Sequence, residues 1–141
     1  MSMAEMTMGK GFAEELNHEA AGTRRFLERI PEDRFTWKPH EKSMSLQQLA
    51  SHLAESFEWA KAIIVDDEFR FDPETYKPWI GMSREEIVRR FDQTLDETLQ
   101  LLRDCSDEKM MQPWRLIGGE TVFFELPRMI VIRSMVISHM I

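Results

Sequence analysis

The chain has 141 residues, which is enough to bury one hydrophobic core without disulfide or metal support. Hydrophobic residues make up 43% and charged residues 30% of it, which excludes the disordered and fibrous classes. The formal net charge of −7 opposes binding to phosphate backbones, so we expect no nucleic-acid partner. The one cysteine, Cys105, excludes an internal disulfide and is more typical of a small structural residue than of a nucleophile.

No part of the sequence indicates a membrane segment or a secretion signal. The apolar run near the C-terminus is interrupted by Arg128, Arg133 and His139, so it falls short of the ~20 apolar residues that a membrane span needs. The N-terminus, "MSMAEMTMGKGF", lacks the basic and apolar regions of a secretory signal. We therefore expect a cytoplasmic protein with no membrane partner.

Apolar spacing and capping residues predict two helices in the first half of the chain. The first has an apolar face with spacings of three and four and ends at Pro31. Ser45 and Gln48 form a capping box at the start of the second. We expect the loop between them, with Trp37, to pack back on the core. The expected buried faces are Phe12, Leu16, Ala20, Thr23, Phe26, Leu27 and Ile30 in the first helix, and Leu46, Leu49, Leu53, Phe57, Ala60 and Ile64 in the second.

The second half predicts two more helices separated by a β-hairpin. After the polar loop "DDEFRFDPETYKPWIGM", Ser83 and Glu86 form a second capping box, and the third helix buries an apolar face. Two β-prone runs joined by Gly118-Gly119 predict a tight hairpin, and "RMIVIRSMVISHMI" after Pro127 predicts a fourth helix. The expected buried face of the third helix is Ile87, Phe91, Leu95, Thr98 and Leu102.

These elements predict an all-α protein, an up-down four-helix bundle with a short β-hairpin before the last helix. We expect one domain over residues 1–141. The last helix has no stop signal, because no Gly, Pro or polar cap precedes the final residue. We therefore expect this domain to be truncated at the C-terminus.

Four histidines are candidates for chemistry. His18 lies among glutamates and points away from the apolar face, so we interpret it as a surface residue. His40 follows a proline in a loop, where a histidine usually caps or packs. His52 shares a helical column with Ser56 and Trp59, at the edge of the core, and its position alone fits a satisfied core residue or a metal ligand.

His139 lies in a helix that is apolar on nearly every side. Burying an imidazole costs free energy unless its nitrogens find partners, and a metal ion is one such partner. Zinc normally takes at least three protein ligands, and the sequence supplies no obvious third. Candidates for a third ligand are His18, Glu19, Glu55 and Glu58.

Several strings resemble the DinB-like (damage-inducible, YfiT-like) family of four-helix-bundle proteins. The string "DRFTWKPHEKSMSLQQLASHLAESFEW" matches the family's Trp-x-Pro-His loop and Leu-x-x-His-Leu helix, and the region from Leu116 to His139 resembles its Gly-Gly hairpin followed by a helix ending in Ser-His. The similarity covers roughly residues 10 to 141.

That resemblance implies a site for a divalent metal, nickel or zinc, held by three histidines. By resemblance, His52 matches the ligand from the second helix and His139 the first member of a His-x-x-x-His pair. The second member would fall two residues past Ile141. The family's relatives imply a homodimer and a metal-dependent hydrolase or thiol S-transferase that acts on a small molecule, with a low-molecular-weight thiol as possible co-substrate.

Two further interpretations stay open. Glu55, one turn after His52, could serve as a general base or could hold a ligand in place, although a solvated glutamate is the commoner reading of such a position. The alternative function is a non-catalytic dimeric bundle that binds a small apolar ligand or a partner helix. Eleven methionines and four tryptophans are compatible with an adaptable apolar pocket.

Overall fold

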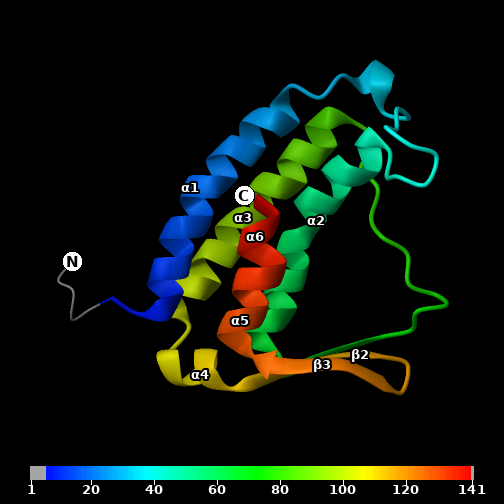
Figure 1. Ribbon diagram of the computed structural model, residues 1–141. Helices are drawn as coiled ribbons and strands as arrows, with labels where there is room; N and C mark the ends of the chain where they lie inside the picture. Colours follow the sequence, from blue (N-terminus) through cyan, green and yellow to red (C-terminus); the bar gives the residue numbers. More distant parts are fainter. Residues whose placement is uncertain (1–5, 141) are drawn as a thin grey trace.

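The computed structural model describes residues 6–140 and is mostly helical, as the sequence predicts. Three long helices, α1 (Met8–Glu28), α2 (Leu46–Val65) and α3 (Arg84–Asp104), pack side by side, with α3 against both others (Figure 1). The C-terminal segment lies against α1 and α2, with its end in front of α3. It consists of α5 (Arg128–Ile132), a π-helical stretch (Arg133–Ile137) and α6 (Ser138–Met140).

Side-chain caps define where the helices begin. The capping box at α2 forms on both sides, since the Ser45 hydroxyl accepts from the Gln48 N–H (3.1 Å) and the Gln48 side chain accepts from the Ser45 N–H (2.8 Å). The box expected at α3 forms on one side only. Ser83 accepts from the Glu86 N–H, but the Glu86 carboxylate accepts from the N–H of Met82. Ser106 caps a short helix, α4 (Asp107–Met111), that the sequence did not indicate.

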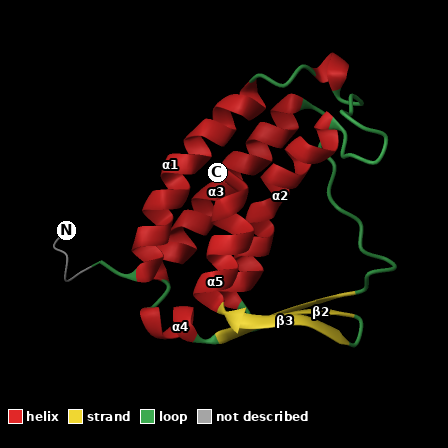
Figure 2. Cartoon of the chain, viewed as in Figure 1, coloured by secondary structure: helices red, strands yellow, loops and turns green. Residues whose placement is uncertain are grey.

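A three-stranded sheet covers one end of the long helices (Figure 2). Strand β2 (Pro113–Gly118) pairs antiparallel with β3 (Thr121–Pro127), and the chain reverses at Gly119, whose φ of 61° suits glycine, and Glu120. The expected polar loop after α2 is partly wrong, because β1 (Glu68–Phe71) forms there and pairs parallel with β2. The rest of that connection runs from the sheet along the side of the molecule to α3.

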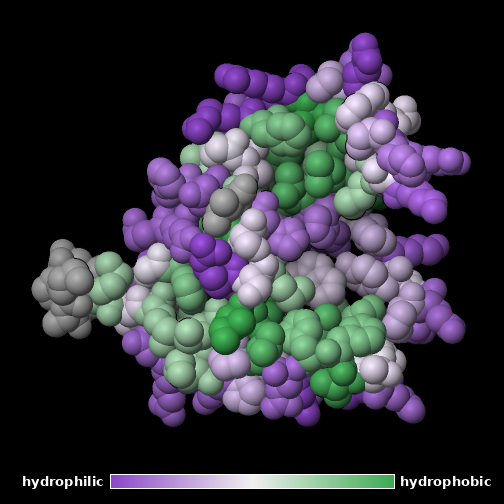
Figure 3. Space-filling model, in the orientation of Figure 1, coloured by the Kyte–Doolittle hydropathy of each residue, from purple (hydrophilic) through white to green (hydrophobic). Residues whose placement is uncertain are grey.

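The helices and the sheet share one apolar cluster. Its largest fully buried apolar side chains include Leu16, Phe57, Phe91 and Trp114, and the Trp114 indole N–H donates to the Ala62 carbonyl (3.3 Å). In Figure 3, apolar side chains also reach the surface near the sheet, while polar ones dominate the periphery. No helix within residues 6–140 is long and apolar enough to cross a membrane.

Three expectations about packing are wrong. Phe26, expected on the buried face of α1, is 46% exposed. The buried face of α2 is centred on Ala50, Ala54 and Phe57, whereas Leu49 is 41% exposed. The alanines allow α3 to approach, and the Thr94 hydroxyl of α3 lies 3.4 Å from the Ala54 carbonyl. Trp37 is 54% exposed and does not pack back on the core.

Candidate functional site

The structure brings two of the four histidines together. His52 lies in the second turn of α2 and His139 in α6, and their ring centroids are 5.3 Å apart with the ring planes at 60°. They are 87 positions apart in the sequence, so only the packing of the C-terminal segment on α2 can make them neighbours. The neighbouring rings form the centre of the candidate site.

A cavity of about 240 Å³ opens beside the two rings. We call it the histidine cavity. From α2 it takes the column of His52, Ser56 and Trp59 that the sequence spacing indicates, and from the C-terminal segment it takes Met135 and His139. Its full lining is His52, Glu55, Ser56, Trp59, Tyr76, Pro78, Met135 and His139.

The π-helical stretch Arg133–Ile137 shapes the C-terminal wall of this cavity. Each π-helical turn holds an extra residue compared with an α-helical one, and such insertions are frequent at functional sites. Here the stretch carries Met135 and ends just before His139, and both side chains line the cavity. If this stretch were α-helical, the residues that follow it would point in different directions around the helix axis, relative to the residues that precede it.

Glu55 is buried, contrary to the expectation of a solvated side chain. It is 8% exposed and lines the cavity, one turn after His52. The Tyr76 hydroxyl donates to one carboxylate oxygen (3.4 Å), and the Trp79 backbone N–H donates to the other (3.3 Å). Both donors come from the connection between β1 and α3, so Glu55 ties that connection to α2.

The two imidazoles both line the cavity and contact each other. Within residues 6–140, neither His52 nor His139 takes part in a hydrogen bond or ion pair; each contacts the other ring. Partial burial of the His139 ring, and then the nearby His52, lower the pKa of His139 below its ordinary value of 6.5. A lowered pKa favours the neutral imidazole, which is the form that binds metals.

The titration of Tyr76 can be followed by absorbance without interference from other tyrosines, because it is the only tyrosine of the chain. Burial, followed by the negative charge of Glu55, raises the pKa of its phenol above the ordinary value of 10.0. Since the raised pKa belongs to the folded state, the associated stability is present below pH 10 and is lost as the pH rises further. Tyrosinate absorbance should show a higher titration midpoint in the folded chain than in the urea-unfolded one.

Glu55→Gln should lower the Tyr76 midpoint toward the unfolded value, because it removes the negative charge and keeps a hydrogen-bond acceptor. A Tyr76 midpoint in the folded wild-type chain that equals or falls below the unfolded value would contradict the partly buried Glu55–Tyr76 contact.

The other candidate residues lie elsewhere. His18 is exposed, as expected. His40 is exposed too, and its Nδ1 accepts from the Lys42 N–H (3.1 Å), a local cap of the kind expected in that loop. Glu58 forms an ion pair with Arg90. Cys105 is buried after α3, and burial raises the pKa of its thiol, which disfavours the nucleophilic thiolate.

A third metal ligand is not found among the described residues. Within residues 6–140, no group of three or more His, Cys, Asp or Glu side chains is placed to hold one metal ion. Of the candidates for a third ligand, Glu55 lines the histidine cavity, whereas His18, Glu19 and Glu58 do not. The described part of the site therefore supplies two imidazoles and a carboxylate that is held by two other donors.

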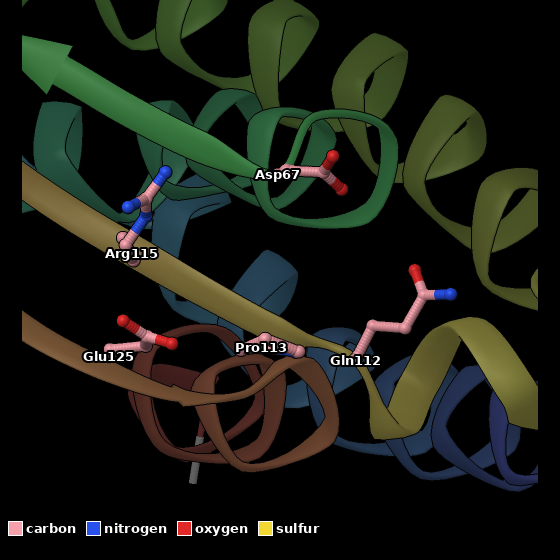
Figure 4. Close-up of a pocket in the computed structure, with 5 residues that line it drawn as sticks. All are labelled: Asp67, Gln112, Pro113, Arg115 and Glu125. Carbon is pink, nitrogen blue, oxygen red and sulfur yellow. The ribbon is translucent and has the colours of Figure 1, made fainter.

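A second cavity, of about 250 Å³, lies at the sheet (Figure 4). Arg115 of β2 and its register partner Glu125 of β3 project from neighbouring strands, close to Asp67. The main charges here are already paired, since Arg115 donates to Glu68 (2.6 Å) and Asp67 accepts from Arg128 (3.0 Å). This cavity is therefore a weaker candidate than the histidine cavity.

Sequence reasoning missed Tyr76, Pro78 and Met135. Tyr76 and Pro78 lie in an irregular connection whose path no periodicity predicts, and Met135 looks like an ordinary core methionine. The "DDEFRFDPETYKPWIGM" string holds one possible signal, because aromatic residues concentrated in a polar loop often pack on a site.

Comparison with known proteins identifies a family. A family model described as the DinB superfamily matches residues 15–132. This range includes His52 and ends seven residues before His139. No curated protein and no solved structure matches the chain.

Proposed function

The chain belongs to the DinB superfamily, and we propose that it is a metal-dependent enzyme that acts on a small molecule at the histidine cavity. The reaction class that fits the family resemblance is hydrolysis or the transfer of a low-molecular-weight thiol. We also infer that the three long helices and the C-terminal segment form the family's up-down four-helix bundle.

The observation that carries the proposal is the spacing of the two imidazoles. Zinc binds imidazole nitrogens at about 2.0–2.1 Å in a tetrahedral arrangement, which puts the centres of two ligating rings about 5 Å apart. The His52 and His139 centroids are 5.3 Å apart, and neither ring is engaged by another donor or acceptor within residues 6–140. Two imidazoles at this spacing beside one cavity therefore fit a divalent zinc or nickel ion.

We propose His52 and His139 as two of the metal ligands. The family pattern places a third histidine four residues after His139, and three neutral ligands would leave an open position, as in catalytic rather than structural zinc sites. A metal bound there would lower the pKa of a water molecule or hold a thiolate.

The rest of the cavity would position the substrate and exclude water. Trp59, Pro78 and Met135 provide apolar walls. Glu55 holds the Tyr76 hydroxyl and the backbone at Trp79, so it fixes the side of the cavity formed by the connection between β1 and α3. Glu55 is the candidate for a general base or a positioning residue, because it is the carboxylate nearest in sequence to His52 that lines the cavity.

A second candidate function is the binding of a small apolar molecule without catalysis. The observation that favours it is that half of the lining residues are aromatic, proline or methionine side chains: Trp59, Tyr76, Pro78 and Met135. Under this alternative, His52 is a half-buried polar residue at the rim, and its replacement would affect the apolar ligand and not a metal.

Calorimetric titration with Zn²⁺ and Ni²⁺ separates the two functions. We expect about one equivalent of metal per chain, with affinity at least about tenfold lower in each of His52→Ala and His139→Ala. The chain offers matched controls, since His18→Ala and His40→Ala remove exposed histidines away from the cavity. Equal metal binding by all four variants, or none by the wild-type chain, would overturn the metalloenzyme and favour the apolar-ligand alternative.

A further inference from the structure

A smaller cavity, of about 160 Å³, adjoins the histidine cavity. Its lining is Glu55, Glu58, Trp59, Phe69 and Tyr76, and we call it the aromatic cavity. Three of these residues, Glu55, Trp59 and Tyr76, also line the histidine cavity. A molecule in the histidine cavity could therefore extend one group into the aromatic cavity.

The aromatic walls come from three separate elements and meet at steep angles. The ring centroid of Trp59 in α2 lies 4.5 Å from that of Phe69 in β1, with the ring planes at 52°. It lies 5.9 Å from the ring centroid of Tyr76, with the planes at 67°. The Phe71 ring, which does not line the cavity, contacts two of these rings, with its centroid 5.7 Å from that of Tyr76 and 6.4 Å from that of Trp59. Rings inclined in this way enclose a space on several sides, and the faces of aromatic rings attract cations.

The charges around the cavity are unbalanced. Glu58 is paired with Arg90, whose guanidinium also lies over the Trp79 ring, 4.6 Å from its centroid. Glu55 is only 8% exposed, and its two hydrogen-bond donors are both neutral. No cationic side chain among residues 6–140 pairs with it. A carboxylate that is buried without a counter-charge is costly, and a ligand cation would supply that charge.

We propose that the aromatic cavity binds the alkylammonium or quaternary ammonium group of an organic cation, with Glu55 as its counter-charge and Trp59, Phe69 and Tyr76 as its walls. This assignment deepens the proposed function, since it makes the substrate of the histidine cavity a small organic cation. The cation site itself is formed by residues that are not proposed metal ligands, so it can be tested on the metal-free protein.

The first test compares two probes of nearly the same shape by calorimetry, choline and its uncharged analogue 3,3-dimethylbutan-1-ol. We expect choline to bind at least about tenfold more tightly, because only choline gains the cation–π and carboxylate attraction. Equal affinity for the two probes would overturn the proposal and show an apolar pocket without preference for charge. Failure of choline to bind at millimolar concentration would overturn it as well.

The second test uses variants of the cavity. Glu55→Gln keeps the size and an acceptor but removes the charge, so choline affinity should fall at least about fivefold while that of the neutral analogue stays the same. Trp59→Leu should weaken choline binding by a similar factor. Glu14→Gln is the matched control, because it removes an exposed charge from α1 outside both cavities. An unchanged choline affinity in Glu55→Gln would overturn the role of Glu55.

The choline and metal titrations test the cation site and the metal site separately. Choline binding without metal binding would leave a cation-binding protein and overturn the metalloenzyme. Metal binding that depends on His52 and His139, without choline binding, would overturn the cation site alone. We expect Glu14→Gln, which lies outside both cavities, to bind zinc as the wild-type chain does.

Discussion

Replacement of Arg128 by alanine is expected to lower the free energy of unfolding by about 3–5 kcal/mol, as measured by urea denaturation. The guanidinium is fully buried, at the first residue of α5. Its Nε donates to the Ile63 carbonyl (2.6 Å) and its Nη1 to the Lys109 carbonyl (2.8 Å). Its Nη2 donates to the Asp66 carbonyl (2.8 Å) and the Asp67 carboxylate (3.0 Å).

The size of this effect follows from what alanine leaves behind. The carbonyls at the end of α2 have no helical partners of their own, and Arg128 satisfies two of them together with one from α4. Removal of the guanidinium leaves these carbonyl oxygens without hydrogen-bond donors and opens a cavity. Because Arg128 joins the C-terminal segment to α2, its loss should also loosen the approach of His139 to His52.

Arg133→Ala is the control for Arg128→Ala. Arg133 forms an ion pair with Glu15 (2.8 Å), but both side chains are more than a third exposed, and exposed pairs contribute about 0–1 kcal/mol. Arg128→Lys should recover only part of the loss, since one ammonium cannot reach acceptors spread around a planar fork. A loss below about 1 kcal/mol in Arg128→Ala would contradict the buried network described here.

Gly9→Ala is the second substitution with a large expected effect, about 1–3 kcal/mol of destabilisation and toward the upper end of that range. A Cβ at position 9 would lie 2.0 Å from the Leu102 carbonyl oxygen of α3 and 3.1 Å from the Cys105 carbonyl oxygen. Both obstacles are backbone atoms that cannot rotate away, so α1 must move away from the end of α3. The melting temperature should fall accordingly.

Gly11→Ala, two positions along the same helix, should have the opposite sign. A Cβ there meets no atom within 4 Å, and alanine is better than glycine inside a helix by about 0.5–1 kcal/mol. The two variants share the same chemical change and the same helix, so their difference isolates the close approach of α1 and α3. Similar melting temperatures for both would contradict that close approach.

Local signals predicted the parts of the fold that depend on neighbours in the sequence. Ser45 and Ser83 each accept from a backbone N–H three residues later, and Ser45 with Gln48 forms the full box that the sequence indicates. The helical column of His52, Ser56 and Trp59 lines the cavity, because side chains three and four positions apart share a face.

The features that depend on tertiary packing could not be predicted in the same way. A hydrophobicity pattern favoured the leucines of α2, but the close approach of α3 required the small Ala50 and Ala54, and Leu49 became exposed. Strand β1 forms because β2 lies beside it, which no local propensity encodes. Glu55 looks like a surface residue until the distant Tyr76 covers it.

The most direct test of the central claim, that His52 and His139 form a metal site, is the X-ray absorption spectrum of the zinc-loaded protein. We expect scattering from at least two imidazole rings, with zinc–nitrogen distances of about 2.0–2.1 Å and no zinc–sulfur distance. A first shell of oxygen atoms without imidazole scattering, or a zinc–sulfur distance of about 2.3 Å from Cys105, would contradict it.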